Sequence, residues 1–106
     1  MSYSVRYSSV AADDLFLIYE YVALELSEPQ TALNLYKDIA AAVDSLADFP
    51  LRHPLFEDEP WRSRGLRKMT VKNFLVFYTA DEENLFVNII RIMYGARDIS
   101  EQLKGV

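Results

Sequence analysis

The chain has 106 residues, of which 51% are hydrophobic and 25% are charged. This composition is typical of one folded domain over residues 1–106, and it excludes a disordered or fibrous chain. The absence of cysteine excludes disulfides, cysteine nucleophiles and zinc sites with cysteine ligands. Because the sequence also has no signal-peptide pattern and no long uncharged apolar run, we expect a cytoplasmic protein that does not enter a membrane.

The net charge of −5 argues against a polyanionic partner at long range, but the charge is unevenly distributed. Residues 1–50 contain two basic and eight acidic residues, whereas the rest of the chain contains nine basic and eight acidic ones. Residues 61–80 contain five basic residues and no acid. The sequence therefore predicts a molecule with an acidic part and a local basic tract.

Two elements are predicted at the start of the chain. Apolar and polar residues alternate over Tyr3–Tyr7, which predicts a short half-buried strand. Ser8 is suited to cap a helix over 10–26, in which apolar residues recur every three or four positions. Asp13 and Asp14 are expected in the first turn of this helix, where its dipole favours acids.

A second helix is predicted directly after the first. The segment Ser27–Gln30 resembles a capping box with proline in the first turn, and the helix is expected to end before Pro50. Its predicted apolar stripe consists of Ala32, Leu35, Tyr36, Ile39, Val43 and Leu46. The short link between the two helices predicts an antiparallel helical hairpin.

The second half of the chain is predicted to be mainly β. Residues 49–60 contain three prolines and no clear period, which indicates a loop. Three β-rich runs follow at 66–71, 74–79 and 85–93, and Asp98 is suited to cap a short helix over 99–103. The order is β-α-α-β-β-β with a short C-terminal helix. This order predicts an α+β fold in which the helical hairpin packs on an antiparallel sheet.

Common catalytic signatures are absent from the sequence. With three glycines and a single histidine, it has no phosphate-binding loop, no Ser-His-Asp pattern and no histidine metal cluster. The acidic run Glu57–Glu59 is interpreted as solvated surface. We therefore expect neither a metal nor a cofactor.

The basic tract allows two interpretations. Its members, with a further arginine on the last strand, are candidates for contacts to nucleic-acid phosphates. They are Arg62, Arg64, Lys68, Lys72 and Arg91, together with Arg67. The alternative is that they pair with Glu57–Glu59 or with the acidic helices. Trp61 is interpreted as an anchor of the loop rather than a platform for base stacking.

The segment Arg91–Asp98 is the second candidate for chemistry. Tyr94 lies at the end of the last predicted strand, and Gly95 allows Arg97 to turn back toward the same surface. A tyrosine among arginines can transfer a proton, and an arginine can stabilise a phosphorane transition state. The alternative is that Arg97 and Asp98 form only a local turn or cap.

At this point the chain resembles the RelE/ParE superfamily of toxins from bacterial type II toxin-antitoxin systems. The resemblance spans nearly the whole chain and rests on the order and spacing of several segments. These are Tyr3–Ser8 with Ala12–Leu15, Ile39–Pro50 ending in Ser-Leu-Ala-Asp-Phe-Pro, Gly65–Arg67, Phe74–Tyr78 and Arg91–Ile99. The superfamily's β-α-α-β-β-β fold agrees with the order of predicted elements.

The resemblance implies a growth-inhibiting toxin from a toxin-antitoxin module of the plasmid-stabilisation kind. It also implies that a cognate antitoxin binds and neutralises the toxin in a hetero-oligomer. The target implied is either ribosomal mRNA, which RelE-like members cleave, or DNA gyrase, which ParE-like members poison. A cleaving enzyme would use Arg67, Tyr94 and Arg97.

One departure from the family's nuclease pattern bears on this choice. Phe74 stands where many of the nucleases have an arginine, so a degenerate toxin that only binds its antitoxin is the alternative function.

A second apolar row on the first helix suggests where the antitoxin binds. Phe16, Tyr19 and Ala23 lie beside the expected core-facing row, so the apolar face is wider than one core contact requires. We expect the antitoxin to cover these residues.

Overall fold

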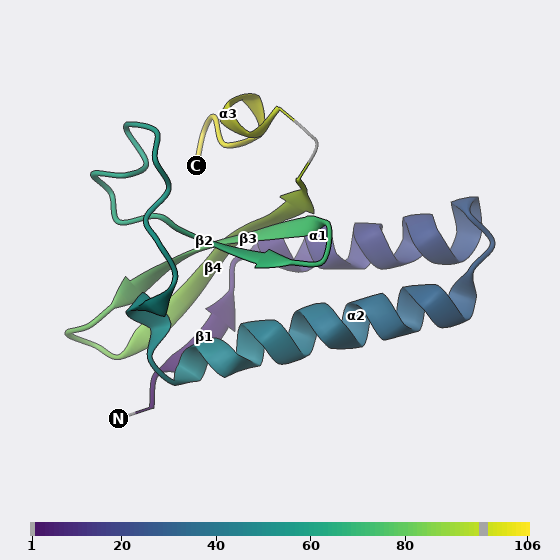
Figure 1. Ribbon diagram of the computed structural model, residues 1–106, viewed down its shortest axis with the longest axis horizontal. Helices are drawn as coiled ribbons and strands as arrows, with labels where there is room; N and C mark the ends of the chain where they lie inside the picture. The colour runs from purple at the N-terminus through teal and green to yellow at the C-terminus, as the bar shows by residue number, and fades with distance from the viewer. Residues whose placement is uncertain (1, 96–97) are drawn as a thin grey trace.

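A four-stranded sheet with a helical hairpin on one face forms the computed structural model, which describes residues 2–95 and 98–106 (Figure 1). The α-helices are α1 (Ser9–Glu20), α2 (Pro29–Asp44) and α3 (Ile99–Gln102), and the strands are β1 (Ser4–Tyr7), β2 (Arg67–Val71), β3 (Phe74–Asp81) and β4 (Phe86–Tyr94). Short π- and 3₁₀-helical segments are η1 (Tyr21–Glu25), η2 (Ser45–Ala47) and η3 (Pro50–Arg52). The predicted α+β order is confirmed.

The strand order is β1-β4-β3-β2. The strands β2, β3 and β4 form the predicted antiparallel meander, with Arg67 opposite Tyr78 on β3 and Tyr94 opposite Phe74 on the same strand. The first strand joins the far edge of the meander in parallel, with Ser4 opposite Phe86. The first and last strands along the chain are therefore neighbours in the sheet.

The central strand β3 is buried on both faces, as its continuous apolar run predicts. Val76 and Tyr78 face the core beneath the helices, with Ile39 on α2. Leu75 and Phe77 face a second apolar cluster on the opposite side of the sheet. This second cluster also holds Phe56, Leu66, Met93 and Leu103, so the loop after α2 and the C-terminal helix cover that face.

The first helix begins as predicted and ends differently. Ser8 is its N-cap, and the Ser8 hydroxyl accepts a hydrogen bond of 2.9 Å from the backbone N–H of Ala11. The predicted position of Asp13 and Asp14 in the first turn is wrong, because that turn contains no acid. Asp14 instead reaches β4. The last part of the predicted helix, η1, is π-helical.

The predicted capping box of the second helix is also wrong. Ser27 has a φ of 53° and belongs to the interhelical turn, while Glu28 is the N-cap without a side-chain capping bond. Pro29 in the first turn is confirmed. Tyr36, which belongs to the predicted apolar stripe of the second helix, is 42% exposed, and Leu26 at the end of the first predicted helix is 52% exposed.

The C-terminal helix is confirmed, since Asp98 Oδ1 accepts a hydrogen bond of 3.2 Å from the backbone N–H of Glu101. The interpretation of Trp61 as a loop anchor is also confirmed. Its ring packs edge-on against Phe56, with the ring centroids 6.0 Å apart, at the margin of the second cluster.

Candidate functional site

Arg67, the first predicted catalytic residue, is engaged with the loop that precedes β2. Its Nη1 donates hydrogen bonds to the backbone carbonyls of His53 at 2.7 Å and Leu51 at 3.3 Å. On the same face, the hydroxyl of Tyr78 donates to the carbonyl of Pro50. The guanidinium therefore ties this loop to the edge of the sheet.

The other members of the basic tract are distributed over several partners. Lys68 lies 3.7 Å from Glu57, and Lys72 lies 2.6 Å from Asp38 on α2. Arg64 donates to the carbonyl of Val106 at 2.8 Å, whereas Arg62 is exposed on the loop. The interpretation that these residues pair with acids is confirmed for the two lysines.

Arg91 forms the most buried of the described ion pairs. Its Nε and Nη2 donate to the carboxylate of Asp14 at 2.7 and 3.1 Å, and its Nη1 donates to the carbonyl of Gln102 at 2.8 Å. The two side chains are 17% and 13% exposed. Arg91 thus joins α1, β4 and the C-terminal helix, and its charge is largely neutralised within the fold.

Tyr94 lies far from Arg67 along the sheet. Tyr94 pairs with Phe74 and Arg67 pairs with Tyr78, so they are separated by four residues of β3, or about 13 Å along the strand. The ring of Tyr94 is partly exposed and packs edge-on against Phe74, with the ring centroids 5.7 Å apart. Arg97, the third predicted catalytic residue, lies outside the described residues.

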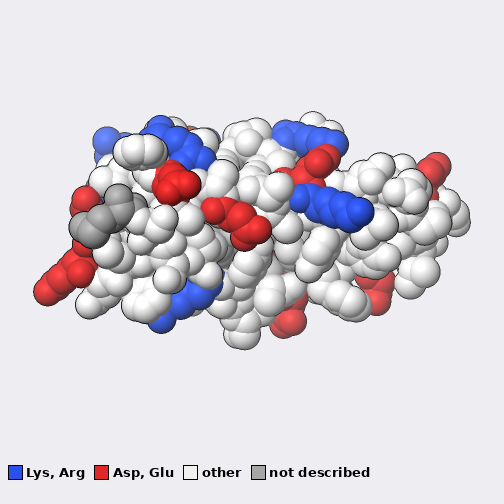
Figure 2. All heavy atoms as spheres, turned by 90° about the horizontal axis from the view of Figure 1, so that it is seen from below, with Lys and Arg blue, Asp and Glu red and all other residues white. Residues whose placement is uncertain are grey.

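The helical hairpin presents the main apolar surface of the molecule. In Figure 2, the right-hand end of the molecule, to which the hairpin extends, is mostly uncharged, with scattered acids near its tip. Phe16 is 57% exposed, whereas Tyr19 and Ala23 are only partly exposed. Tyr19 packs edge-on against Tyr36 of α2. Of the three predicted antitoxin contacts, Phe16 is therefore the most accessible.

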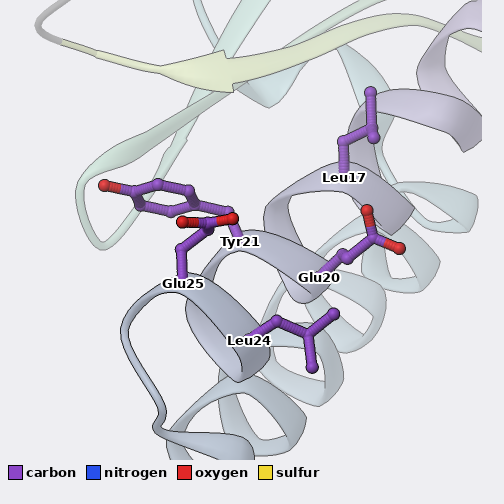
Figure 3. A pocket seen from close by; sticks show the side chains of 5 residues that line it. All are labelled: Leu17, Glu20, Tyr21, Leu24 and Glu25. Atoms are coloured by element: carbon purple, nitrogen blue, oxygen red, sulfur yellow. The ribbon is translucent and has the colours of Figure 1, made fainter.

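A second exposed apolar row was missed by the sequence analysis. Leu17, Tyr21 and Leu24 follow one another at steps of four and three residues, and Leu24 is 69% exposed. They border a shallow hollow of about 300 Å³ with Glu20 and Glu25 (Figure 3). Helical spacing alone indicates this exposure. Leu17 lies about 200° around the helix from the core residue Leu15, so it is on the side that faces away from the core. We call Leu17, Tyr21 and Leu24 the outer row.

Several titrating groups have shifted pKa values, with local causes. Burial, followed by the charge of Arg52, lowers the pKa of His53, whose Nε2 is buried without a hydrogen-bond partner among the described residues. Burial and the nearby Asp44 raise the pKa of Tyr7 to about 12. Neither group is among the residues predicted to act on a target.

Among residues 2–95 and 98–106, no group of three or more potential ligands is placed to hold a metal ion. In the same part of the chain, every helix is too short or too polar to cross a membrane.

Solved toxin structures share this fold. The chromosomal ParDE toxin-antitoxin system from P. aeruginosa contains a chain that is 27% identical, with a TM-score of 0.68 over 88% of this chain and 96% of that one. The RelBE2 toxin-antitoxin complex from Mycobacterium tuberculosis contains one that is 21% identical, with a TM-score of 0.63 over 89% and 99%. A doubly substituted E. coli toxin RelE in the free state is 10% identical, with a TM-score of 0.66 over 96% and 93%.

The fold is therefore that of the small α+β toxins. The family model described as ParE toxin of type II toxin-antitoxin system, parDE, matches residues 5–99. The chain belongs to this family. No curated protein sequence matches it.

Proposed function

We propose that this toxin inhibits growth by acting on DNA gyrase, and that a cognate antitoxin neutralises it by covering the helical hairpin. The main support for a gyrase target is that the described candidate residues for mRNA cleavage are dispersed. The backbones of Arg67 and Tyr94 are separated by about 13 Å along β3, and the Arg67 guanidinium is engaged with the carbonyls of Leu51 and His53.

The electrostatics of the chain support the same choice. Binding to the ribosome would require attraction to RNA phosphates, which is weakened by the net charge of −5. Arg91 binds Asp14, and two lysines of the basic tract also have carboxylate partners. A protein target does not depend on such a basic surface. Since gyrase acts on the bacterial chromosome, the proposed place of action is the cytoplasm.

The exposed apolar side chains of the hairpin support the proposed antitoxin site. Phe16 and the outer row present several large apolar groups outside the core. A disordered antitoxin segment that folds on this surface would remove them from water. The expected complex is a hetero-oligomer of toxin and antitoxin.

Two parallel reactions test the target. The purified chain is added to gyrase with supercoiled plasmid and ATP, and separately to a translating extract. We expect trapped DNA breaks in the first reaction and intact mRNA in the second. Plasmid without gyrase is the control for the first reaction. Cleavage of mRNA in the ribosomal A site without DNA breaks would reverse the assignment.

Growth after induction without the antitoxin tests the alternative of a degenerate toxin. The proposal expects growth arrest that is relieved by the antitoxin. Normal growth with abundant folded toxin would indicate that only antitoxin binding has been retained.

A further inference from the structure

The outer row of the hairpin borders a hollow whose only charged residues are acids. The lining consists of Leu17, Tyr21 and Leu24 together with Glu20 and Glu25. In Figure 3, the two glutamates lie on opposite sides of the labelled group. Neither carboxylate belongs to an ion pair within residues 2–95 and 98–106. Both glutamates are exposed, so both carboxylates are accessible to a partner.

These two acids belong to a longer segment in which all charges are negative. Residues 7–36 contain five acidic residues and no lysine, arginine or histidine. Asp14 is neutralised by Arg91, whereas the other four are exposed, namely Asp13, Glu20, Glu25 and Glu28. In the view of Figure 2, the right-hand end of the molecule shows acids and no basic residue. We therefore expect a negative potential over this end of the hairpin.

The helical turn at this hollow is not α-helical. In the π-helical segment η1, the backbone N–H of Leu26 donates to the carbonyl of Tyr21, five residues earlier, at 3.1 Å. Single π-helical turns are rare and are frequently found at functional sites. This one carries Tyr21, Leu24 and Glu25, which line the hollow. The irregular turn is therefore a reason, independent of charge, to expect binding at the outer row.

The charge of this surface limits what can cover it. A second copy of the chain, bound through the same face, would bring its own Glu20 and Glu25 toward these carboxylates, and like charges in one interface cost free energy. Nucleic acid and an anionic lipid surface would be repelled for the same reason. A polypeptide with lysine or arginine beside its apolar residues would bury the outer row and also supply the opposite charge.

The backbone of the hairpin limits the form of that polypeptide. Residues 9–25 are helical, so their backbone groups bond within the helix and cannot pair with an added strand. Recognition must therefore use side chains. The outer row spans about 10 Å, or two helical turns, from Leu17 to Leu24. An amphipathic helix fits this row, because its own apolar residues recur at steps of three and four.

We propose that the antitoxin covers the outer row with an amphipathic helix whose lysine or arginine side chains pair with Glu20 and Glu25. The proposal rests on the proposed antitoxin site and adds to it the form and the charge of the segment that binds. The outer row supplies apolar burial, and the two glutamates select the partner. A segment with the same apolar pattern and acidic flanks would be rejected.

A double substitution tests the role of charge. Glu20→Gln together with Glu25→Gln keeps the size of both side chains and removes their charge. The full-length toxin is titrated with the full-length cognate antitoxin by isothermal calorimetry in about 50 mM NaCl. We expect the Kd to rise about five- to thirtyfold, as the loss of two interfacial ion pairs implies. An unchanged Kd would overturn the proposal.

The matched control removes the same number of exposed charges elsewhere. Glu82→Gln together with Glu83→Gln changes two acids on the β3–β4 turn, and we expect the Kd to stay within about twofold of the wild-type value. Equal losses of affinity in the two double variants would also overturn the proposal, because only the net charge would then matter.

Ionic strength provides a second measurement. Salt screens ion pairs, so raising NaCl from about 50 to about 500 mM should weaken antitoxin binding more for the wild type than for the Glu20→Gln, Glu25→Gln variant. The same salt dependence in both proteins would contradict the proposed pairing.

Leu24→Ser separates this proposal from the proposed function. It removes an apolar contact and keeps both carboxylates, and it should weaken antitoxin binding at either salt concentration. If Leu24→Ser weakens binding and the double glutamine variant does not, the hairpin remains the antitoxin site and only the charge pairing is refuted. If neither weakens binding, the antitoxin site and the charge pairing are both refuted. The gyrase reaction contains no antitoxin, so its result is independent of these outcomes.

Discussion

The carboxylate of Asp14 on α1 binds the guanidinium of Arg91 on β4, at a point where β4 no longer pairs with β1. Its carboxylate accepts two hydrogen bonds from the Arg91 guanidinium, and Oδ2 also accepts one of 3.0 Å from the backbone N–H of Ile92. The strand β1 has ended at Tyr7 by this point, so the edge of β4 is open there. The Asp14 carboxylate thus accepts a hydrogen bond from the backbone N–H of Ile92 at this open strand edge, and it also neutralises the charge of Arg91.

We predict that Arg91→Met lowers the free energy of unfolding by about 2–4 kcal/mol, because it leaves the largely buried Asp14 carboxylate without its cation. Urea denaturation at neutral pH measures the change. The control is Lys72→Met, which removes the exposed pair with Asp38 and is expected to cost less than about 1 kcal/mol. Equal small losses would show that the Asp14–Arg91 pair has no special structural role.

Tyr78→Phe is expected to destabilise the chain without changing the packing of its ring. The substitution removes the hydroxyl that donates to the Pro50 carbonyl beneath the loop, and we expect a loss of about 1–2 kcal/mol. Thermal and urea unfolding measure it. The control is Tyr94→Phe, since the exposed Tyr94 hydroxyl should make little difference to stability. A neutral Tyr78→Phe would mean that water replaces the lost donor.

The stability of the toxin is expected to depend on pH through His53. Its pKa is lowered from 6.5 in the folded state, chiefly by burial, so the unfolded chain binds the proton more readily. This contribution to stability is therefore complete above about pH 6.5 and is lost as the pH falls toward the lowered folded value. Unfolding midpoints between pH 5 and 8 are compared for the wild type and His53→Gln. A slope that is the same in both would assign the effect to other groups.

Antitoxin binding is expected to depend on the outer row of the hairpin. Leu24→Glu places a charge in the proposed apolar interface and should raise the Kd for the antitoxin at least about tenfold. Isothermal calorimetry measures the affinity, and an unchanged unfolding midpoint shows that the toxin remains folded. The matched control is Glu83→Leu on the β3–β4 turn. An unchanged Kd for Leu24→Glu would exclude Leu24 from the interface.

The sequence predicted the helices and strands whose apolar periodicity reflects burial. It did not predict features that depend on contacts between residues far apart in the chain. The apolar run in β3 and the Ser8 cap are local signals, and both were predicted correctly. The position of Asp14 depends on Arg91, which lies 77 residues away, so the helix pattern alone placed it wrongly. Ser27 was assigned to a capping box because its left-handed conformation leaves no trace in the residue type.

The candidate site was harder to predict than the fold for the same reason. Their residue types made Arg67 and Tyr94 candidates for catalysis. Only the strand register gives their separation along the sheet. Leu17, Tyr21 and Leu24, by contrast, could have been found from their helical spacing.

The parallel pairing of β1 with β4 also bears on when the toxin can form during synthesis. Arg6 on β1 donates to Asn88 on β4 at 2.6 Å, across a separation of 82 residues. The ribosome must release the chain through β4 before these strands can meet, and closing so long a loop slows folding. A nascent or truncated chain that lacks β4 cannot complete the sheet, so each active toxin molecule requires translation through β4.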